Sequence, residues 1–227
     1  MKKGIDAPIV PILFSVIGVI GILIAWQSQN TYNFIFPAIM FILAILFIHT
    51  SLDGKYKIIH DVVKSLDIPN DSQILDLGTG HGAVLLAVAK KLKQPGKAIG
   101  IDIWQSADQS GNSQTTTQQN IDRAQVSAVA KVQTADMTKL PFNDHAFDFV
   151  FASFAIHNVK PRKQRELAIN EALRVLKTDG RLVIIDMEHT REFKRIITQS
   201  GWQVTVHHAG INGLWGGMPT SILIAQK

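Results

Sequence analysis

The sequence predicts an α/β fold: a doubly wound, seven-stranded, mostly parallel sheet with its last strand antiparallel, preceded by two transmembrane helices. Three observations predict it. No Asp, Glu, Lys or Arg occurs between Ala7 and Leu52. From about residue 70 onward, short apolar runs alternate with stretches of helical periodicity. The first of these runs passes directly into a loop with three glycines, "LGTGHG".

The uncharged N-terminal segment is long enough for two membrane-spanning helices, at about residues 8–26 and 32–50. A spanning helix needs about 20 apolar residues. Trp26 and Tyr32 fall where interfacial aromatic residues are expected, and Pro37 falls in the first turn of the second helix. The alternatives are a buried soluble hairpin and a cleaved signal peptide. The signal peptide is disfavoured because the apolar run is too long and a second run follows it.

Charges on either side of the hairpin predict its orientation. Lys2 and Lys3 precede the first span, Lys55 and Lys57 follow the second, and the connecting loop has no positive charge. The positive-inside rule therefore places both ends of the chain, and the domain that follows, in the cytoplasm. We expect a two-pass protein of the cell (inner) membrane, with the lipid bilayer as a partner. The small-residue spacing in "VIGVIGIL" would suit a homodimer.

The change of pattern divides the chain into a membrane hairpin over residues 1–53, an amphipathic linker helix over 54–69 and an α/β domain over 70–227. Strands of the domain are expected at 73–77, 98–103, 131–135, 147–153, 181–186, 203–208 and 221–226. Helices are expected at 82–93, 115–128, 161–177 and 189–200. The alternation predicts a parallel sheet covered on both faces, and the loop before the last strand predicts an antiparallel final pair.

Composition excludes several kinds of chemistry. The chain has no cysteine, which excludes disulfides, thiolate nucleophiles and Cys-ligated zinc. A formal net charge of +5 suits a solvated face or an anionic membrane surface. No block of Lys and Arg with interleaved aromatic residues is present, so we expect no nucleic-acid partner. We also expect no metal site.

The glycine loop after the first strand of the domain predicts a ligand site. In open α/β sheets, ligands lie beyond the carboxyl ends of the strands. Gly78 and Gly80 would let a ligand approach the backbone without a Cβ in the way. Taken with Asp102, the loop could be a nicotinamide-dinucleotide fingerprint. Asp76, however, lies two residues before the first glycine, and its carboxylate suits an ammonium or a sulfonium better than a pyrophosphate.

Two further acids end the next two predicted strands. Asp102 could accept hydrogen bonds from both ribose hydroxyls of a nucleoside. Asp136 could accept one from an adenine amino group. Three acids at the ends of three consecutive strands therefore describe a site for a positively charged nucleoside.

Taken together, "ILDLGTGHG", "GIDIW", "ADMTKLPF", "FDFVFASFAIHNV" and "LRVLKTDGRLVIID" resemble the class I S-adenosylmethionine (SAM)-dependent methyltransferases. The chain is most similar to their small-molecule group with a type 11 methyltransferase domain, which includes the ubiquinone/menaquinone methyltransferases. The resemblance covers about residues 70–227 and implies a Rossmann-like methyltransferase fold, S-adenosyl-L-methionine as cofactor and S-adenosyl-L-homocysteine as product. It implies these cofactor-binding residues: Asp76, Gly78, Thr79, Gly80, Gly82, Asp102, Ile103, Trp104, Asp136, Met137 and Ser153. The segment 105–114 is longer than is usual in the family and is expected to fold over the cofactor.

Candidates for a base or a substrate contact follow the fourth and fifth strands. His157 and His189 are the catalytic candidates, because an imidazole is poised near neutral pH. Asn158, Thr190 and Trp215 are candidates for substrate contacts. For "GINGLWGGMPTS", between the last two strands, three roles stay open: a pocket wall, a membrane contact and a plain hairpin.

We therefore expect a membrane-anchored SAM-dependent methyltransferase that acts on a small, lipophilic molecule at the cytoplasmic face. The hairpin motivates the lipophilic substrate, since it would confine the site near the membrane. A non-catalytic SAM-binding or assembly protein is the alternative from a different class. An NAD-dependent oxidoreductase is a third and weaker alternative.

Overall fold

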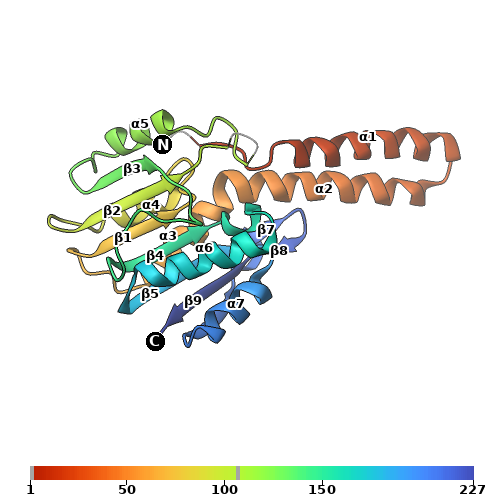
Figure 1. Cartoon of the computed structure of the whole chain (residues 1–227). Helices are drawn as coiled ribbons and strands as arrows, with labels where there is room; N and C mark the ends of the chain where they lie inside the picture. Colours follow the sequence, from red (N-terminus) through yellow and green to blue (C-terminus); the bar gives the residue numbers. More distant parts are fainter. Residues whose placement is uncertain (1–2, 106–107) are drawn as a thin grey trace.

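A seven-stranded sheet, in the order β3-β2-β1-β4-β5-β9-β6, organises the part of the chain that follows the hairpin (Figure 1). The computed structural model describes residues 3–105 and 108–227, so Lys2 lies outside the described residues. The main strands are β1 (Gln73–Leu77), β2 (Lys97–Asp102), β3 (Ala130–Thr134), β4 (Phe147–Ser153), β5 (Leu176–Asp186), β6 (Gln203–His208) and β9 (Ser221–Gln226). β9 pairs antiparallel with β5 and β6, and the other neighbours pair in parallel. The predicted sheet, with its last strand antiparallel, is confirmed.

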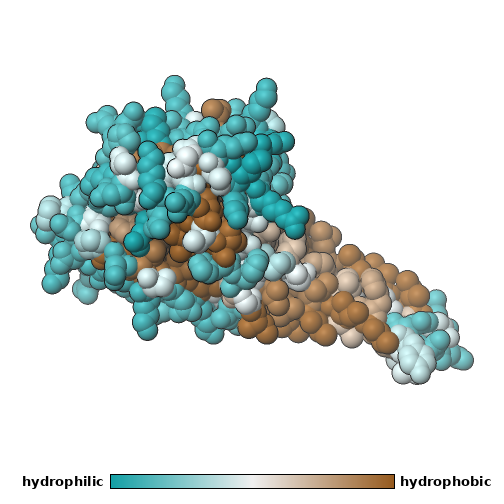
Figure 2. Space-filling model, turned by 90° about the horizontal axis from the view of Figure 1, so that it is seen from below, coloured by the Kyte–Doolittle hydropathy of each residue, from teal (hydrophilic) through white to brown (hydrophobic). Residues whose placement is uncertain are grey.

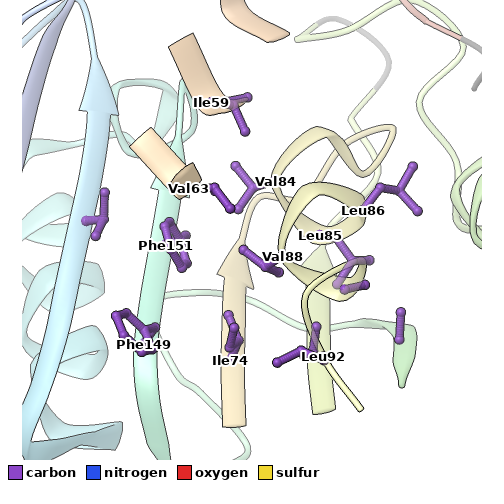
Figure 3. Packing of buried hydrophobic residues seen from close by; sticks show 14 of the residues in the cluster. Ile59, Val63, Ile74, Val84, Leu85, Leu86, Val88, Leu92, Phe149 and Phe151 are labelled. Atoms are coloured by element: carbon purple, nitrogen blue, oxygen red, sulfur yellow. The ribbon is translucent and has the colours of Figure 1, made fainter. Parts of the chain in front are cut away.

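Helices cover both faces of this sheet, as the alternation of strands and helices predicts. Apolar side chains of α3 (Lys55–Ser65), α4 (Ala83–Ala89) and α5 (Gln114–Arg123) pack on one face, and those of α6 (Arg162–Val175) and α7 (Thr190–Gln199) on the other. Figure 3 shows the first of these layers, where side chains of α3 and α4 meet the phenyl rings of β4. The switch in strand order lies between β1 and β4, where a ligand site is expected.

The N-terminal hairpin extends away from the sheet as two antiparallel helices, α1 (Ile9–Ser28) and α2 (Ile35–His49), joined through the short 3-10 helix η1 (Thr31–Phe34) (Figure 1). Most of its apolar side chains face outward. Leu23, for example, is 61% exposed and Ile45 is 66% exposed. Figure 2 shows this apolar surface along the hairpin, between a hydrophilic tip and the hydrophilic domain. Length and composition allow both helices to cross a membrane.

The glycines of "VIGVIGIL" serve the packing of α1 against α2 within one chain. Gly18 lies so close to the ring of Phe41 that a Cβ at this position would be 3.0 Å from it. Gly21 lies in the same way against Phe36 and Pro37. Both glycines are buried in the single chain. The small residues therefore allow α1 and α2 of one chain to pack closely. A homodimer remains a prediction, but this stretch does not support it.

The second span continues without a loop into the domain. After α2 the chain makes one π-helical turn, η2 (Thr50–Gly54), and continues as α3, so that Thr31–Ser65 forms one helix of 35 residues. The helix predicted over residues 54–69 is thus α3, and it does more than link. Its side chains Ile58, Ile59, Val62 and Val63 are buried in the core over the sheet.

A small hairpin that the sequence pattern did not show interrupts the connection between β6 and β9. It consists of the 3-10 helix η4 (Gly210–Gly213), β7 (Leu214–Trp215) and β8 (Met218–Pro219). Gly216 and Gly217 form its two-residue turn, and both have positive φ. Such turns are typical of tight hairpins. We call residues 210–219 the β7–β8 hairpin.

Candidate active site

The loop after β1 adopts a backbone that only glycine tolerates easily. Gly78, Gly80 and Gly82 have φ values of +65°, +50° and +86°, in the region where an L side chain is strained. A Cβ on Gly78 would lie 2.5 Å from the Cβ of Ala155. The N–H of Thr79 donates to the carbonyl of Ile101, which ties the loop to β2. The alternating glycines thus give a tight turn at the carboxyl end of β1.

Asp76 lies beneath this loop and is 2% exposed. Its Oδ2 accepts hydrogen bonds from Thr79 Oγ1 at 2.7 Å and from the N–H of Leu85 at 3.1 Å. Burial raises the pKa of Asp76 to about 7, against these hydrogen bonds, which lower it. A nearby positive charge would therefore stabilise the ionised form of Asp76.

Asp102 ends β2 and closes the other side of the loop. Its Oδ2 accepts from the N–H of Gly80 at 2.8 Å, and its Oδ1 accepts from the N–H of Trp104 at 2.7 Å. Asn112 Nδ2 lies 3.3 Å from the same Oδ1. A carboxylate has about four acceptor positions, so Asp102 can hold this backbone and still accept from a ligand.

A cavity of about 770 Å³ opens where these strands end. This volume is in the usual range for a site that takes a small molecule or cofactor. Ten of the predicted site residues line it: Asp76, Gly78, Thr79, Gly80, Asp102, Ile103, Asp136, Met137, Ser153 and Asn158. The hydroxyl of Ser153 is buried there, and it has no hydrogen-bond partner among the described residues.

The other predicted residues lie outside the cavity lining. These are Gly82, Trp104, His157, His189, Thr190 and Trp215. Trp104 has a left-handed backbone with φ of 62°, and its indole N–H donates to Thr134 Oγ1 on β3 at 2.8 Å. Trp215 is 1% exposed, between the rings of Phe47 and Phe154. Thr190 is the first residue of α7.

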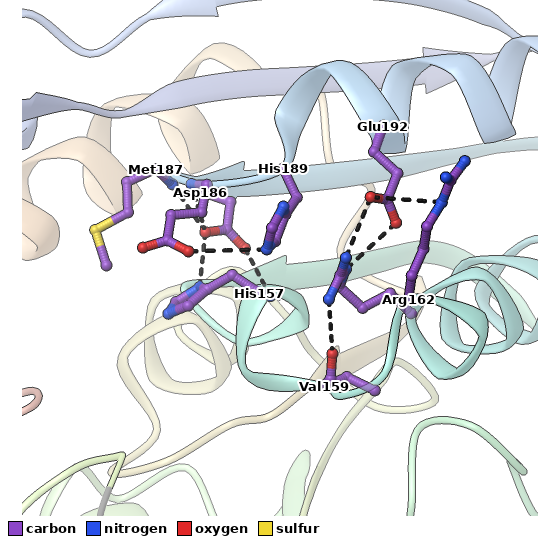
Figure 4. A network of polar contacts seen from close by, with 9 residues as sticks. His157, Val159, Arg162, Asp186, Met187, His189 and Glu192 are labelled. Atoms are coloured by element: carbon purple, nitrogen blue, oxygen red, sulfur yellow. Dashed lines mark hydrogen bonds and ion pairs between the residues drawn. The ribbon is translucent and has the colours of Figure 1, made fainter.

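His157 follows β4 in the 3-10 helix η3 (Ile156–Asn158), and its Nδ1 lies 2.7 Å from Oδ1 of Asp186 (Figure 4). Asp186 ends β5 and is fully buried. Burial lowers the pKa of His157, but the Asp186 carboxylate outweighs burial, and the net pKa is raised. Asp108, which lines the cavity, also contributes to this rise. His157 therefore lies at the margin of the cavity, with a fixed ring and a charged partner.

His189 is placed differently. It precedes α7 with a φ of 55°, and its Nε2 lies 3.8 Å from Glu188 Oε2. Its ring lies edge-on to Phe193, at 6.4 Å between centroids. Arg165 connects the segment after η3 to α7. Its guanidinium donates to the carbonyl of Val159 and to the carboxylate of Glu192 on α7. Figure 4 shows this network beside the His157–Asp186 pair.

Sequence reasoning missed one wall of the cavity. It comes from the start of the chain and from α3, and includes Asp6, Lys55, Tyr56 and Ile59. Lys55 is 4% exposed, and its ammonium lies 2.5 Å from Asp6 Oδ2. The Tyr56 hydroxyl is buried without a partner among the described residues. The sequence places Asp6 immediately before the uncharged segment and Lys55 just after it, but neither position indicates that the two residues meet.

The segment 105–114 reaches this wall from above the glycine loop. Gln109 donates from Nε2 to Asp6 Oδ1 at 2.8 Å and accepts at Oε1 from the N–H of His81 at 3.0 Å. Gln105, Asp108 and Asn112 line the cavity too. Residues 106–107 lie outside the described part of the chain. Gln109 thus joins the glycine loop to Asp6, and an isolated antiparallel bridge pairs the backbones of the same two residues. That the segment folds over the cofactor stays a prediction.

Comparison with known proteins agrees with this geometry. Residues 75–184 match the family described as a methyltransferase domain. The demethylmenaquinone methyltransferase of Lactiplantibacillus plantarum is 31% identical over 121 residues, which is 53% of this chain and 47% of that protein. The ubiquinone/menaquinone biosynthesis C-methyltransferase UbiE of Geotalea uraniireducens is 28% identical over 165 residues, 73% of this chain and 65% of that protein. The chain thus spans about half to two thirds of the length of these relatives.

Solved structures show the same fold at low sequence identity. A SAM-dependent methyltransferase from Aquifex aeolicus has a TM-score of 0.58 at 20% identity, over 74% of this chain and 89% of the other. A geranyl diphosphate C-methyltransferase from Streptomyces coelicolor, solved with Mg²⁺, geranyl diphosphate and S-adenosyl-L-homocysteine, has a TM-score of 0.60 at 13% identity. It covers 79% of this chain and 81% of the other. At these identities the likeness establishes the fold alone.

Proposed function

We propose, from the methyltransferase domain that this chain carries, that it is a membrane-anchored enzyme that transfers a methyl group from SAM to a small, lipophilic molecule at the cytoplasmic face. The anchor is the two-pass hairpin. Both ends of the chain and the catalytic domain lie in the cytoplasm.

One observation carries the proposal. Three acids, Asp76, Asp102 and Asp136, lie near the carboxyl ends of three neighbouring strands and line one cavity beside the glycine loop. This arrangement suits a ligand that joins a nucleoside to a cationic group. A pyrophosphate would instead meet carboxylates on three sides, which argues against a nicotinamide dinucleotide.

The residues present fit SAM. Asp76 lies beneath the glycines and would face the ammonium and sulfonium end. Asp102 would accept from the ribose hydroxyls, and Asp136 with Met137 would contact the adenine. Ser153, whose buried hydroxyl has no partner among the described residues, would complete the contacts at the end of β4. Gly82 would act on the cofactor only through the shape of the loop, and Trp104 only through the position of Asp102.

The cofactor supplies a methyl group that its sulfonium has already activated for in-line displacement. The chain must therefore mainly align the acceptor and, where the acceptor carries a proton, remove it. We assign that proton to His157, whose Nδ1 is paired with Asp186 and whose Nε2 would accept the proton. Asn158, next to it, lines the cavity and would hold the acceptor. His189 and Thr190 are more distant, and we place them in support of this loop.

The acceptor would occupy the end of the cavity nearest the hairpin. Among the residues that line the cavity, Tyr56 and Ile59 belong to α3, which continues the helical hairpin, and Phe154 contacts Trp215. Tyr56 would offer its phenol to the acceptor, and Ile59 and Phe154 would offer apolar surface. Tyr56 is seven residues past His49, where α2 ends, so it lies about 10 Å beyond the apolar span along the helix. A molecule with a polar ring and an apolar tail could reach this end of the cavity and leave its tail in lipid.

A labelling experiment with the full-length protein in native membranes tests the proposal. Methyl-labelled SAM is supplied, and the products are partitioned between lipid and aqueous phases, with an Asp102→Ala preparation as control. We expect label in the lipid phase that the control lacks. Label in the aqueous phase alone would leave a methyltransferase with a soluble substrate. SAM binding without any label would point to the non-catalytic alternative, and binding of NADH alone would contradict the proposal.

A further inference from the structure

We propose that the β7–β8 hairpin is a second membrane contact, whose Gly216–Gly217 turn enters the interfacial layer of the leaflet that the two helices cross. The inference rests on the proposed membrane anchor. It adds a surface outside the matched methyltransferase residues, with lipid headgroups and upper acyl chains as its partner. This contact would hold the domain at one angle to the membrane.

The β7–β8 hairpin is fixed to the base of the helical hairpin rather than to the sheet alone (Figure 1). The ring of Trp215 meets that of Phe47, in the last turn of α2, at 5.1 Å and an interplanar angle of 74°. Thr50 Oγ1 donates to the carbonyl of Leu214 at 2.9 Å. The backbone of Asn212 packs on Gly54 so closely that a side chain there would have no room. The turn therefore keeps its position relative to the spans.

Contacts of the two turn glycines give the depth of the turn. A Cβ on Gly216 would lie 2.8 Å from the ring of Phe14 in α1, and one on Gly217 would lie 3.5 Å from Leu43 in α2. Phe14 is five residues inside the start of α1, and Leu43 is six residues before the end of α2. At 1.5 Å per residue, both lie about 8 to 9 Å inside the apolar spans. Interfacial segments enter the headgroup and acyl boundary by about 5–10 Å.

The composition of the segment suits that depth. No charged residue occurs between His208 and Lys227. Ile211 is 69% exposed, and Met218, which pairs with the buried Trp215, is 41% exposed. Two large apolar side chains left exposed at the base of a membrane hairpin would be covered by lipid. An irregular backbone is acceptable here because the interfacial layer still offers hydrogen-bond partners, which the hydrocarbon core does not.

The contact also reaches the candidate active site. Phe154, which lines the cavity, lies edge-on to Trp215 at 5.0 Å. Trp215 thus touches the span through Phe47 and the cavity wall through Phe154. This position explains why Trp215 is buried without lining the cavity itself.

Site-directed labelling measures the depth of the turn, and the absence of cysteine makes each introduced thiol unique. The full chain carrying Met218→Cys is labelled with an environment-sensitive fluorophore and reconstituted in vesicles of phosphatidylcholine and phosphatidylglycerol. Quencher lipids carry a nitroxide near the headgroup or deep in the acyl chain. Val19→Cys, in the middle of α1, is the control for the hydrocarbon core. Lys93→Cys, in the exposed turn after α4, is the control for water.

We expect the label at position 218 to be quenched several-fold more by the shallow nitroxide than by the deep one. The label at position 19 should show the opposite order, and the label at position 93 only quenching by aqueous iodide. A label at 218 that behaves like the one at 93, while 19 is quenched in lipid, overturns the second contact and leaves the anchor intact. If position 19 is also quenched only by iodide, the membrane anchor itself is wrong and the second contact falls with it.

Discussion

The ammonium of Lys55, on the helix that continues the second span, lies 2.5 Å from the carboxylate of Asp6, the last charged residue before the first span. Asp6 also accepts from Ser51 Oγ and from Gln109 Nε2. Gln109 in turn accepts from the N–H of His81 in the glycine loop. The base of the hairpin is thereby connected to the candidate cofactor site through side chains whose pairing no local pattern predicts.

Removing one partner of this ion pair is expected to destabilise the protein. Lys55 is buried, and loss of one member of a buried pair costs about 3–5 kcal/mol because the other charge stays uncompensated. Lys55→Met and Asp6→Asn should each lower the thermal unfolding midpoint in detergent, and the double variant should lose less than the sum. Lys57→Met, which removes an exposed pair with Asp53, is the matched control and should change little. Additive losses would show that Lys55 and Asp6 act independently.

Cofactor affinity should depend on pH through Asp76. Burial raises the pKa of this carboxyl to about 7, so below pH 7 it is mostly protonated in the free protein. A cationic ligand favours the ionised form, so its binding must release that proton. The dissociation constant of SAM should therefore rise by up to about tenfold for each pH unit below 7 and level off above it. Calorimetry in buffers of different ionisation enthalpy measures the released proton.

The same shift affects stability with the opposite sign. The folded-state pKa of Asp76 is above its ordinary value, so the free protein should become more stable as pH falls from 7 toward 4. Asp76→Asn should abolish both pH effects. If that variant keeps the steep pH dependence of SAM binding, another group is responsible.

Asp102→Ala should weaken SAM binding by roughly 10- to 100-fold, because hydrogen bonds to a charged group contribute about 1.5–3 kcal/mol. Part of the loss would come from the loop itself, since Asp102 accepts from the N–H of Gly80. His157→Ala should keep the affinity and lose turnover. Asp122→Ala, at an exposed acid on α5, serves as the control. Unchanged SAM affinity in Asp102→Ala would refute the ribose assignment.

The pH profile of turnover should report His157. A base must be unprotonated, and the Asp186 carboxylate raises the pKa of His157, so turnover should rise with pH through that pKa. Asp186→Asn removes the charge that favours the imidazolium. It should therefore move the rising limb of the profile to lower pH. A limb that stays in place would mean that another group carries the proton.

Tyr56→Phe tests the acceptor end of the cavity. The variant keeps the ring and removes only the hydroxyl that is buried without a described partner. One hydrogen bond contributes about 0.5–1.5 kcal/mol, so KM for the acceptor should rise by roughly 2- to 12-fold while the SAM dissociation constant stays the same. An equal loss of SAM affinity would place Tyr56 on the cofactor instead.

The sequence predicted the elements whose signals are local. β1, β4, β6 and β9 begin and end where the apolar pattern places them, and the glycine loop has the conformation that its spacing requires. Where tertiary contacts determine the end of an element, the observed boundary differs from the predicted one. β5 begins at Leu176 rather than at residue 181, because Leu176 pairs with Phe147 beyond an irregularity in the ladder.

The residues whose surroundings the sequence did not predict depend on contacts between distant parts of the chain or on an unusual backbone conformation. The direction of Trp104 depends on a left-handed backbone at that residue, and the position of Trp215 depends on the docking of the β7–β8 hairpin against Phe47. Lys55 and Asp6 are brought together only when the two helices pair. Interactions over such separations leave no period or motif to read, so the hairpin side of the cavity could not be predicted.

If the hairpin crosses a membrane as proposed, the continuous helix from Thr31 to Ser65 would hold the cavity wall stiffly relative to the bilayer. Transmembrane helices adjust to thinner or thicker hydrocarbon by changing their tilt. No flexible loop lies between the span and α3 to absorb such a change, and only the π-helical turn at Thr50–Gly54 departs from regular helix. A change in bilayer thickness would then shift Tyr56 relative to the glycine loop. The length of the lipid acyl chains would therefore affect the geometry of the cavity.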